Sequence, residues 1–128
     1  MPTLPNRLED GEPISRFVFD SRHFSTVDRK AKPKAFEPKN NCVSVLRAIG
    51  LTDAEVWDWA VTYVEPERGK ACRARADLTV VSVRRLILDL VRDEPPPRHA
   101  NIVGWPDDKS AQKLLSIELA AEATLVVR

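Results

Sequence analysis

Ten prolines divide the chain of 128 residues into short segments, and this limits the length of any helix or strand. Pro33 and Pro38 keep residues 29–40 from forming a helix, because proline lacks a backbone N–H and disfavours helical geometry in the residue before it. Pro66 ends any helix that precedes it, and the run 95–97 favours an extended polyproline segment. The chain is therefore expected to fold as many short elements.

The clearest helix signal begins after Leu51. Thr52 and Glu55 form a capping box, in which the hydroxyl accepts from the Glu55 amide and the carboxylate accepts from the Thr52 amide. Leu51 and Val56 match the accompanying hydrophobic staple. Apolar residues then recur at helical spacing, which predicts a helix over about residues 53–64.

A second long helix is expected after the turn at residues 104–108, capped by Asp107 or Asp108. Its apolar stripe steps by three and four residues from Ala111 to Leu125. Thr79 is a candidate cap for a short third helix. Strands are expected within residues 13–19, 42–46, 70–77, 87–92 and 99–105.

This order of elements predicts an α+β fold: a mostly antiparallel sheet with two main helices and one short helix packed on it, the helices on one face. Residues 1–12 are polar and contain prolines, so we expect a flexible lead-in there. Residues 13–128 are expected to form a single globular domain.

Composition excludes several classes of protein. With 43% hydrophobic and 30% charged residues, the chain matches neither a disordered tail nor a membrane protein. Its net charge of +1 creates no global attraction to DNA or lipid. The N-terminus lacks the apolar core of a secretory signal, and Cys42 and Cys72 are typical of buried, reduced thiols. We therefore expect a soluble, cytoplasmic protein with no membrane partner.

Metal and cofactor motifs are not recognisable. The two histidines and two cysteines lack the paired spacing of zinc ligands. The four glycines form no phosphate-binding loop, and there is no nucleophile elbow of a serine hydrolase. No metal site and no cofactor are therefore predicted.

Two histidines, His23 and His99, each follow an arginine in the sequence. If they met in one cleft, they could act as an acid–base pair in metal-independent phosphoesterase or transferase chemistry. The His-x-Ser pattern at His23 fits half of the two-histidine phosphoesterase motif, but Asn101 breaks the second half. A structural role, a hydrogen bond from each ring to the backbone, is the alternative.

Two basic runs, residues 29–39 and 67–75, could form a phosphate-facing patch if the chain folds them together. The alternative is two separate solvated segments. The candidate ligand-binding side chains are Arg22, Lys34, Arg47, Arg75 and Arg98. We predict on this basis a binding or accessory module that recognises an anionic ligand, a nucleic acid or a nucleotide.

Trp57 and Trp59 lie two positions apart on the first predicted helix, so their rings point in different directions. One ring is expected in the core and the other at a surface, where it could contact a partner protein. A protein-interaction role is therefore a third hypothesis.

Motifs spread over residues 13–125 resemble those of a group of short bacterial proteins. They are SRHFS from Ser21, KAFEP from Lys34, VSVLR from Val43, ARADL from Ala74 and PRHANIVGWP from Pro97, the last being the most distinctive. The resemblance implies a complete stand-alone domain, and it implies no particular activity.

Overall fold

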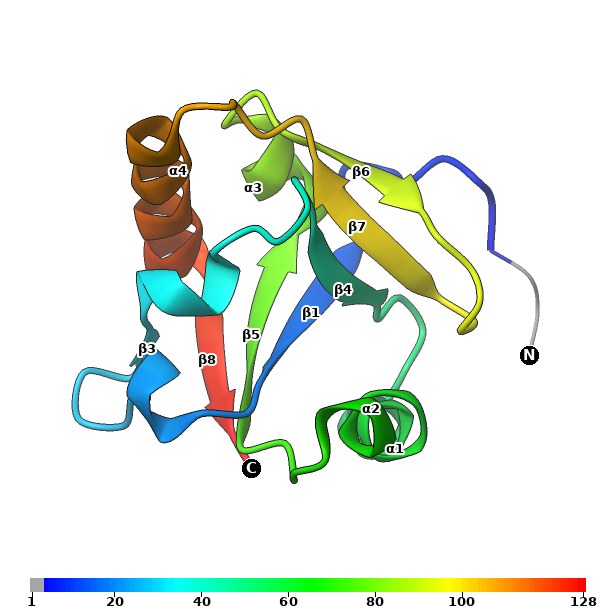
Figure 1. The fold of residues 1–128 in the computed structure, drawn as a ribbon. Helices are drawn as coiled ribbons and strands as arrows, with labels where there is room; N and C mark the ends of the chain where they lie inside the picture. The colour runs from blue at the N-terminus through cyan, green and yellow to red at the C-terminus, as the bar shows by residue number, and fades with distance from the viewer. Residues whose placement is uncertain (1–3) are drawn as a thin grey trace.

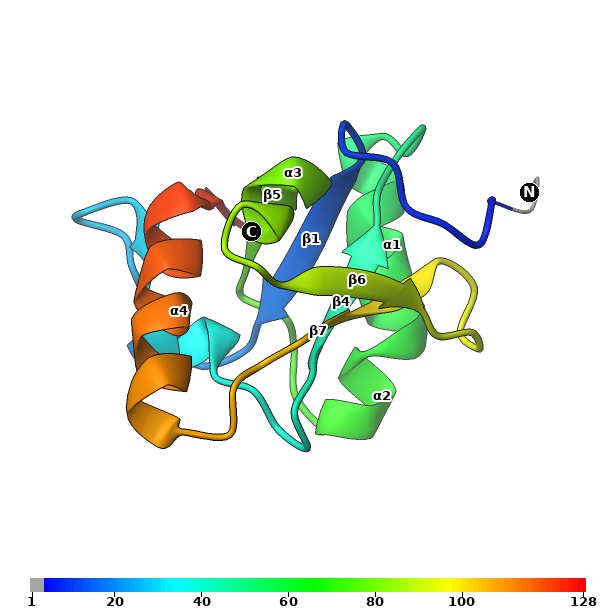
Figure 2. The same ribbon diagram turned by 90° about the horizontal axis from the view of Figure 1, so that it is seen from above.

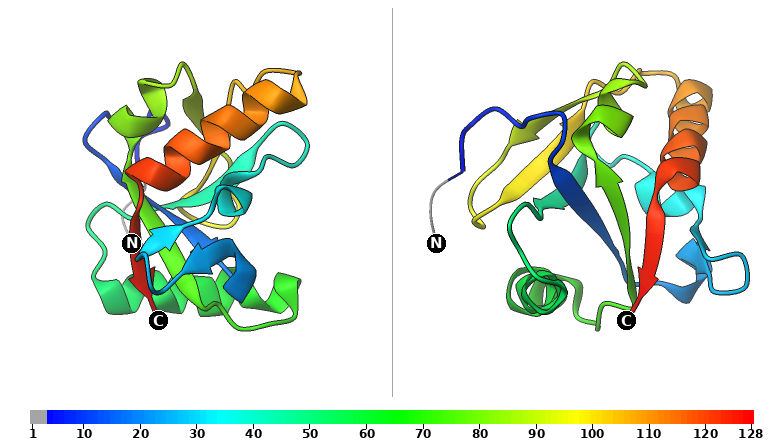
Figure 3. Two further views of the ribbon diagram at one scale, coloured as in Figure 1. Left: turned by 90° about the vertical axis from the view of Figure 1, so that its left-hand side faces the viewer. Right: turned by 180° about the vertical axis from the view of Figure 1, so that it is seen from behind.

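The computed structural model describes residues 4–128 and contains a six-stranded sheet in which all paired strands are antiparallel (Figure 1). The strand order is β6-β7-β4-β1-β5-β8, and the view from behind shows β8, β5 and β1 side by side (Figure 3). The strands of this sheet are β1 (Pro13–Val18), β4 (Val43–Arg47), β5 (Ala74–Thr79), β6 (Asp89–Arg92), β7 (His99–Val103) and β8 (Thr124–Val127). A two-stranded sheet joins β2 (Phe24–Ser25) to β3 (Lys30–Ala31).

The helices confirm the predicted α+β class. Within residues 4–128 they are α1 (Asp53–Tyr63), α2 (Glu65–Arg68), α3 (Val80–Arg84), α4 (Lys109–Glu122) and the 3₁₀ helices η1 (Ser21–His23) and η2 (Pro33–Phe36). The helix expected after Thr79 is α3, and Asp108 caps α4 by accepting from the Ala111 amide at 3.2 Å. η2 lies in the segment that the prolines were predicted to keep free of helix; a proline at its first position is compatible with a short helix.

The predicted extension of the last helix to Leu125 is wrong. Ala123 adopts an extended conformation (φ −71°, ψ 145°), and the β-branched residues after it form β8 beside β5. The expected polyproline segment is also wrong, because residues 95–97 form the bend between β6 and β7. In that bend the His99 amide donates to the Pro96 carbonyl at 3.2 Å.

The helices lie on both faces of the sheet, contrary to the prediction of one face (Figure 2). Successive side chains of β1 point to opposite faces of the sheet, so they enter two different hydrophobic cores. Ile14 and Val18 belong to the cluster that α4 covers, with Leu119 buried in it. Phe17 belongs to the cluster beneath α1, with Trp59. Each long helix therefore buries its apolar stripe against a different face.

The capping box of α1 is present as predicted. The Thr52 hydroxyl accepts from the Glu55 amide at 3.2 Å, and the Glu55 carboxylate accepts from the Thr52 amide at 2.9 Å. We expect Thr52→Ala to lower the free energy of unfolding by about 1 kcal/mol, because the first turn loses its side-chain acceptor. Urea unfolding followed by tryptophan fluorescence measures the change. Thr62→Ala, at an exposed position of the same helix, is the control and should cost nothing; equal losses in the two variants would contradict the capping role.

The later part of the expected lead-in packs against the domain, whereas residues 1–3 lie outside the described residues. Leu8 is buried in the α4-side cluster. Glu12 is 3% exposed, and its carboxylate accepts from the Arg47 guanidinium at 3.0 and 2.9 Å. Packing therefore starts before the predicted boundary at residue 13.

The central strands β1 and β4 pair only at one end. Ile14 and Ser15 face Arg47 and Leu46, and beyond these residues the strands diverge (Figure 1). β1 continues its pairing with β5, and β4 continues with β7. The sheet is therefore split along its middle, next to η2.

Both cysteines are free: Cys72 is buried in the α1-side cluster and Cys42 is half-buried. Burial raises the pKa of the Cys72 thiol, which disfavours its reactive thiolate. No helix in residues 4–128 has the length and apolar character needed to cross a bilayer.

Candidate ligand-binding groove

Two adjoining cavities open at the split between β1 and β4. We call them the aromatic pocket, of about 280 Å³, and the basic pocket, of about 340 Å³, and together they form the groove. The aromatic pocket is lined by Phe17, Trp59, Tyr63, Pro95, Pro96 and His99, among others. The basic pocket is lined by His23, Lys34, Lys39 and Lys70, among others. Arg16, Phe17, Phe19 and Arg68 line both pockets, so the two lie side by side along a shared wall.

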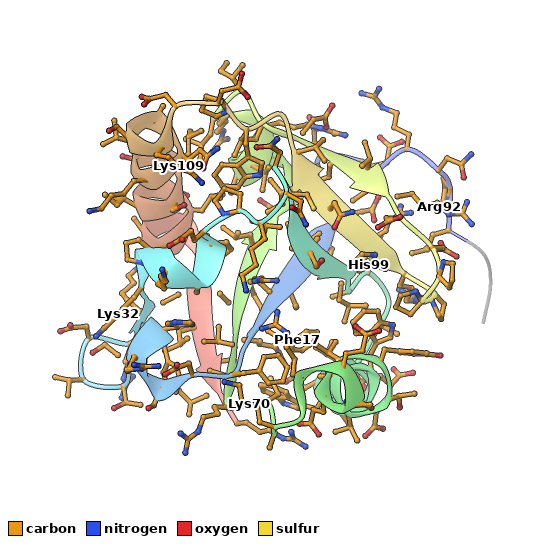
Figure 4. All side chains as sticks on the ribbon, viewed as in Figure 1. Phe17, Lys32, Lys70, Arg92, His99 and Lys109 are labelled. Atoms are coloured by element: carbon orange, nitrogen blue, oxygen red, sulfur yellow. The ribbon has the colours of Figure 1, made fainter. Side chains whose placement is uncertain are left out.

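The side-chain view shows the same arrangement, with Phe17 between Lys70 and His99 (Figure 4). Phe17 belongs to β1, Lys70 follows α2, and His99 begins β7. The groove is thus built from three parts of the chain that the fold brings together.

Arg16 occupies the split itself. Its Nε donates to the Ala35 carbonyl of η2 and its Nη1 to the Ser44 carbonyl of β4, each at 3.0 Å. No carboxylate in residues 4–128 forms an ion pair with it. Burial, and then the positive charge of Arg68, lower the pKa of Arg16 to about 10. Arg16 therefore stays charged at neutral pH without a carboxylate partner among residues 4–128.

The groove carries more positive than negative side chains: five cations and three carboxylates line it. Two of the carboxylates are already paired, Glu37 with Lys34 at 2.8 Å and Asp20 with Arg22 at 2.7 Å. Within residues 4–128, Lys39 and Lys70 form no ion pair. These residues make the groove locally basic on a chain whose total charge is nearly balanced.

Arg68 makes a cation–π contact instead of an ion pair in the described part of the chain, with its guanidinium carbon 5.1 Å from the centre of the Phe19 ring. An aromatic ring positions a guanidinium without neutralising it. The charge of Arg68 thus adds to that of Arg16 in both pockets.

The two predicted catalytic histidines line adjoining pockets. His23 lies in the basic pocket, where burial lowers its pKa, and the charges of Arg22, Lys34 and Lys70 lower it further against the opposing effect of Asp20. Its ring makes no contact with that of His99 among the described hydrogen bonds. The structure therefore places the pair in one groove without joining them directly.

His99 lies in the aromatic pocket, and its Nδ1 is 2.6 Å from the Asp93 carbonyl oxygen. A carbonyl only accepts, so Nδ1 carries the proton and Nε2 of the neutral ring is an acceptor. This contact also matches the structural alternative, in which the ring bonds to the backbone.

Three of the five arginine and lysine side chains predicted to bind ligand are buried and internally bonded, which corrects the predicted set. Arg47 is 0% exposed, is held by Glu12 and also donates to the Pro5 carbonyl at 2.7 Å. Arg98 donates to the carbonyls of Arg47 and Ile49 at 3.1 and 2.6 Å. Neither guanidinium lines the groove.

Arg75 is likewise internal. It bonds to Asp53 at 2.6 Å and to Asp77 at 3.1 Å, and so ties the start of α1 to the sheet. Of the other two predicted residues, Lys34 lines the basic pocket, and Arg22 is exposed and paired with Asp20 beside it. Only Lys34 of the predicted set is therefore inside the groove.

The two indoles of the predicted partner surface differ in burial as expected, Trp59 lying in the core and Trp57 being half-buried. Trp59 is buried, and its Nε1 donates to the Pro97 carbonyl at 2.8 Å. The guanidinium carbons of Arg75 and Arg128 lie 4.8 and 5.7 Å from the centre of the Trp57 ring. Trp57 therefore contacts two guanidinium groups of its own chain, and a protein-interaction role remains a hypothesis.

The two basic runs do come together. Lys34 and Lys39 of the first run line the same pocket as Arg68 and Lys70 of the second.

Sequence reasoning missed Arg16, although a signal was present: this arginine lies on the same face of β1 as the buried residues Ile14 and Val18. A charge at an interior position of a strand needs a structural or functional reason.

Comparison with protein-family models, curated proteins and solved structures gives no match. Among residues 4–128, no group of three or more histidine, cysteine, aspartate and glutamate side chains is placed to hold a metal ion.

Proposed function

We propose that the protein is a binding or accessory module whose groove holds a phosphate-bearing ligand, a nucleic acid or a nucleotide. The observation that carries the proposal is Arg16, a partly buried cation without a carboxylate partner in the described chain, on the wall shared by the two pockets. A charge in that position is stabilised when an anion enters.

The hydrogen-bonding capacity of Arg16 supports this proposal. A guanidinium has five N–H donors, and the described bonds of Arg16 use its Nε and Nη1 atoms only. The Nη2 group is thus available, and the planar geometry of arginine suits the oxygens of a phosphate. Lys39 and Lys70, which form no ion pair in the described part of the chain, can neutralise further negative charge in the basic pocket.

The experiment is a titration of the protein into a rhodamine-labelled thymidine strand of about 10 nucleotides, followed by fluorescence anisotropy. We expect affinity to fall steeply between about 50 and 200 mM salt, because binding releases counter-ions. The double variant Arg68→Gln/Lys70→Gln should reduce the slope of log affinity against log salt by about 0.7 for each charge removed.

Arg85→Gln is the matched control for that titration, because Arg85 is exposed at the end of α3 and lines neither pocket. Its salt slope should equal that of the unmodified protein. Absence of binding at low salt would contradict the proposed function, and so would equal slopes in the control and the double variant.

Binding should also depend on pH through His23. The pKa of His23 lies below its usual 6.5, mainly because of burial, so the ring is neutral at pH 7.5. A phosphate in the basic pocket favours the charged ring and raises this pKa. Linkage then requires affinity to increase as pH falls below about 6.5, by about two- to tenfold at pH 5.5. The same anisotropy titration, repeated across this pH range, measures the increase in affinity. The increase should disappear in His23→Gln. If the pH dependence is unchanged in that variant, a group other than His23 causes it.

Metal-independent phosphoesterase or transferase chemistry is a second candidate function. One observation favours it: His23 and His99 line pockets that share Arg16, a cation able to hold a phosphate. Its test is release of nitrophenol from bis(nitrophenyl) phosphate in the presence of EDTA. Turnover that His99→Gln abolishes would support this chemistry, and absence of turnover would contradict it.

A further inference from the structure

We infer that the ligand is single-stranded nucleic acid, with one unstacked base in the aromatic pocket and the adjoining phosphates at Arg16 and in the basic pocket. This inference rests on the proposed function. The observation behind it is that a cavity lined largely by aromatic rings and prolines lies directly beside a cationic one.

The aromatic pocket has the surfaces that a base requires. Trp59 and Tyr63 of α1 form one wall, with ring centres 5.3 Å apart. Pro95, Pro96 and His99, from the β6–β7 bend and the start of β7, contribute to the same cavity. Tyr63 is 37% exposed, so its ring is accessible for stacking, whereas Trp59 is largely covered. Stacking on aromatic side chains is how proteins hold unpaired bases without reading their sequence.

Cations in the second pocket favour a strand over a mononucleotide. Arg16 and Arg68 border the aromatic pocket and can hold the phosphate of the bound nucleotide. Lys39 and Lys70 line the basic pocket on the other side of that shared wall, where they can hold a neighbouring phosphate. Single-strand sites combine such a cationic track with a stacking platform.

A duplex fits this arrangement poorly. Its bases are stacked and paired, so a base can enter a recessed cavity only after it has unpaired and left the stack, which is unfavourable. The phosphates of a duplex could still contact the exposed lysines, but the aromatic pocket would stay empty. We therefore expect a preference for single strands.

The test compares three rhodamine-labelled probes of equal length: a thymidine strand, an abasic strand with the same sugar–phosphate backbone, and a thymidine–adenosine duplex. The thymidine strand should bind at least about fivefold more tightly than the abasic strand, because one base gains a stacking contact. It should also bind more tightly than the duplex at equal salt.

A pair of variants in one helix assigns the difference to the aromatic pocket. Tyr63→Ala should weaken binding of the thymidine strand by about the same factor and leave the abasic strand unchanged. Val61→Ala is the control, since Val61 is 42% exposed, belongs to the same helix and does not line the groove. Thermal unfolding of both variants verifies that they are folded.

The outcomes separate this inference from the proposed function. Equal binding of the thymidine and abasic strands would overturn the inference and leave phosphate binding intact. Tighter binding of the duplex, or displacement of the strand by equimolar thymidine monophosphate, would also overturn it. Failure of all three probes to bind at low salt would contradict the proposed function itself.

Discussion

Replacing Glu12 by alanine is expected to lower the free energy of unfolding by about 3–5 kcal/mol, the largest effect we predict for a single substitution on stability. Arg47 is 0% exposed and its guanidinium donates to both oxygens of the Glu12 carboxylate. Without Glu12, Arg47 keeps its charge in the interior with no carboxylate partner. Urea unfolding followed by tryptophan fluorescence measures the loss.

Two further variants make this prediction specific. Glu9→Ala is the control, because Glu9 is exposed in the same segment and its carboxylate forms no described ion pair; it should change stability by less than about 0.5 kcal/mol. Glu12→Leu combined with Arg47→Met should be more stable than Glu12→Ala, because no unpaired charge is left in the core. A loss for Glu12→Ala as small as that for Glu9→Ala would contradict the structural role of the pair.

Arg16→Met is expected to weaken binding of the thymidine strand by roughly 10- to 100-fold, the largest effect predicted on binding. A hydrogen bond from a charged group contributes about 1.5–3 kcal/mol, which corresponds to this range. Methionine keeps much of the aliphatic volume but removes the guanidinium that borders both pockets. Fluorescence anisotropy at about 50 mM salt measures the loss.

Arg16 also bridges η2 and β4, so its removal can affect the fold near the split. Arg16→Lys separates the two effects, because lysine keeps the charge and loses the planar fork of donors. We expect intermediate affinity for this variant. Arg85→Met is the matched control and should bind like the unmodified protein. Unchanged affinity in a folded Arg16→Met variant would show that the groove does not bind the strand.

Local signals predicted the starts of α1 and α4, because the residues that cap these helices lie close together in the sequence. The capping box of α1 involves residues three positions apart, and the cap of α4 involves Asp108 and Ala111. The end of α4 was harder to predict, because apolar residues continue at helical spacing from the helix into β8. Pairing of β8 with β5 ends the helix at Glu122, and that partner is distant in the sequence.

The long-range partners of Arg47 and Arg75 were not predictable from neighbouring residues. Arg47 is neutralised by Glu12, 35 positions earlier, and Arg75 contacts Asp53, 22 positions earlier. Such pairs depend on which strands and helices become neighbours. In the sequence, Arg47, Arg75 and Lys34 are equally good candidates for binding an anion. Of these three, only Lys34 lines the groove.

The groove itself depends on a non-local event, the separation of β1 from β4 after two residue pairs. No sequence pattern in either strand marks that point. The two basic runs were visible in the sequence, and their meeting follows from the position of η2 and of the segment after α2 around the end of β1. The interior arginine of β1 was the one local clue to where they meet.

A ligand site at the split between β1 and β4 is the premise of both binding proposals. It is tested most directly by a nuclear magnetic resonance titration of isotope-labelled protein with the unlabelled thymidine strand, observing the backbone amides. Binding at the split should shift amide signals mainly in residues 16–19 and 67–70, while those of α3 and β6 stay in place. Shifts confined to α3, β6 or another surface away from the groove, or no shifts at low salt, would contradict it.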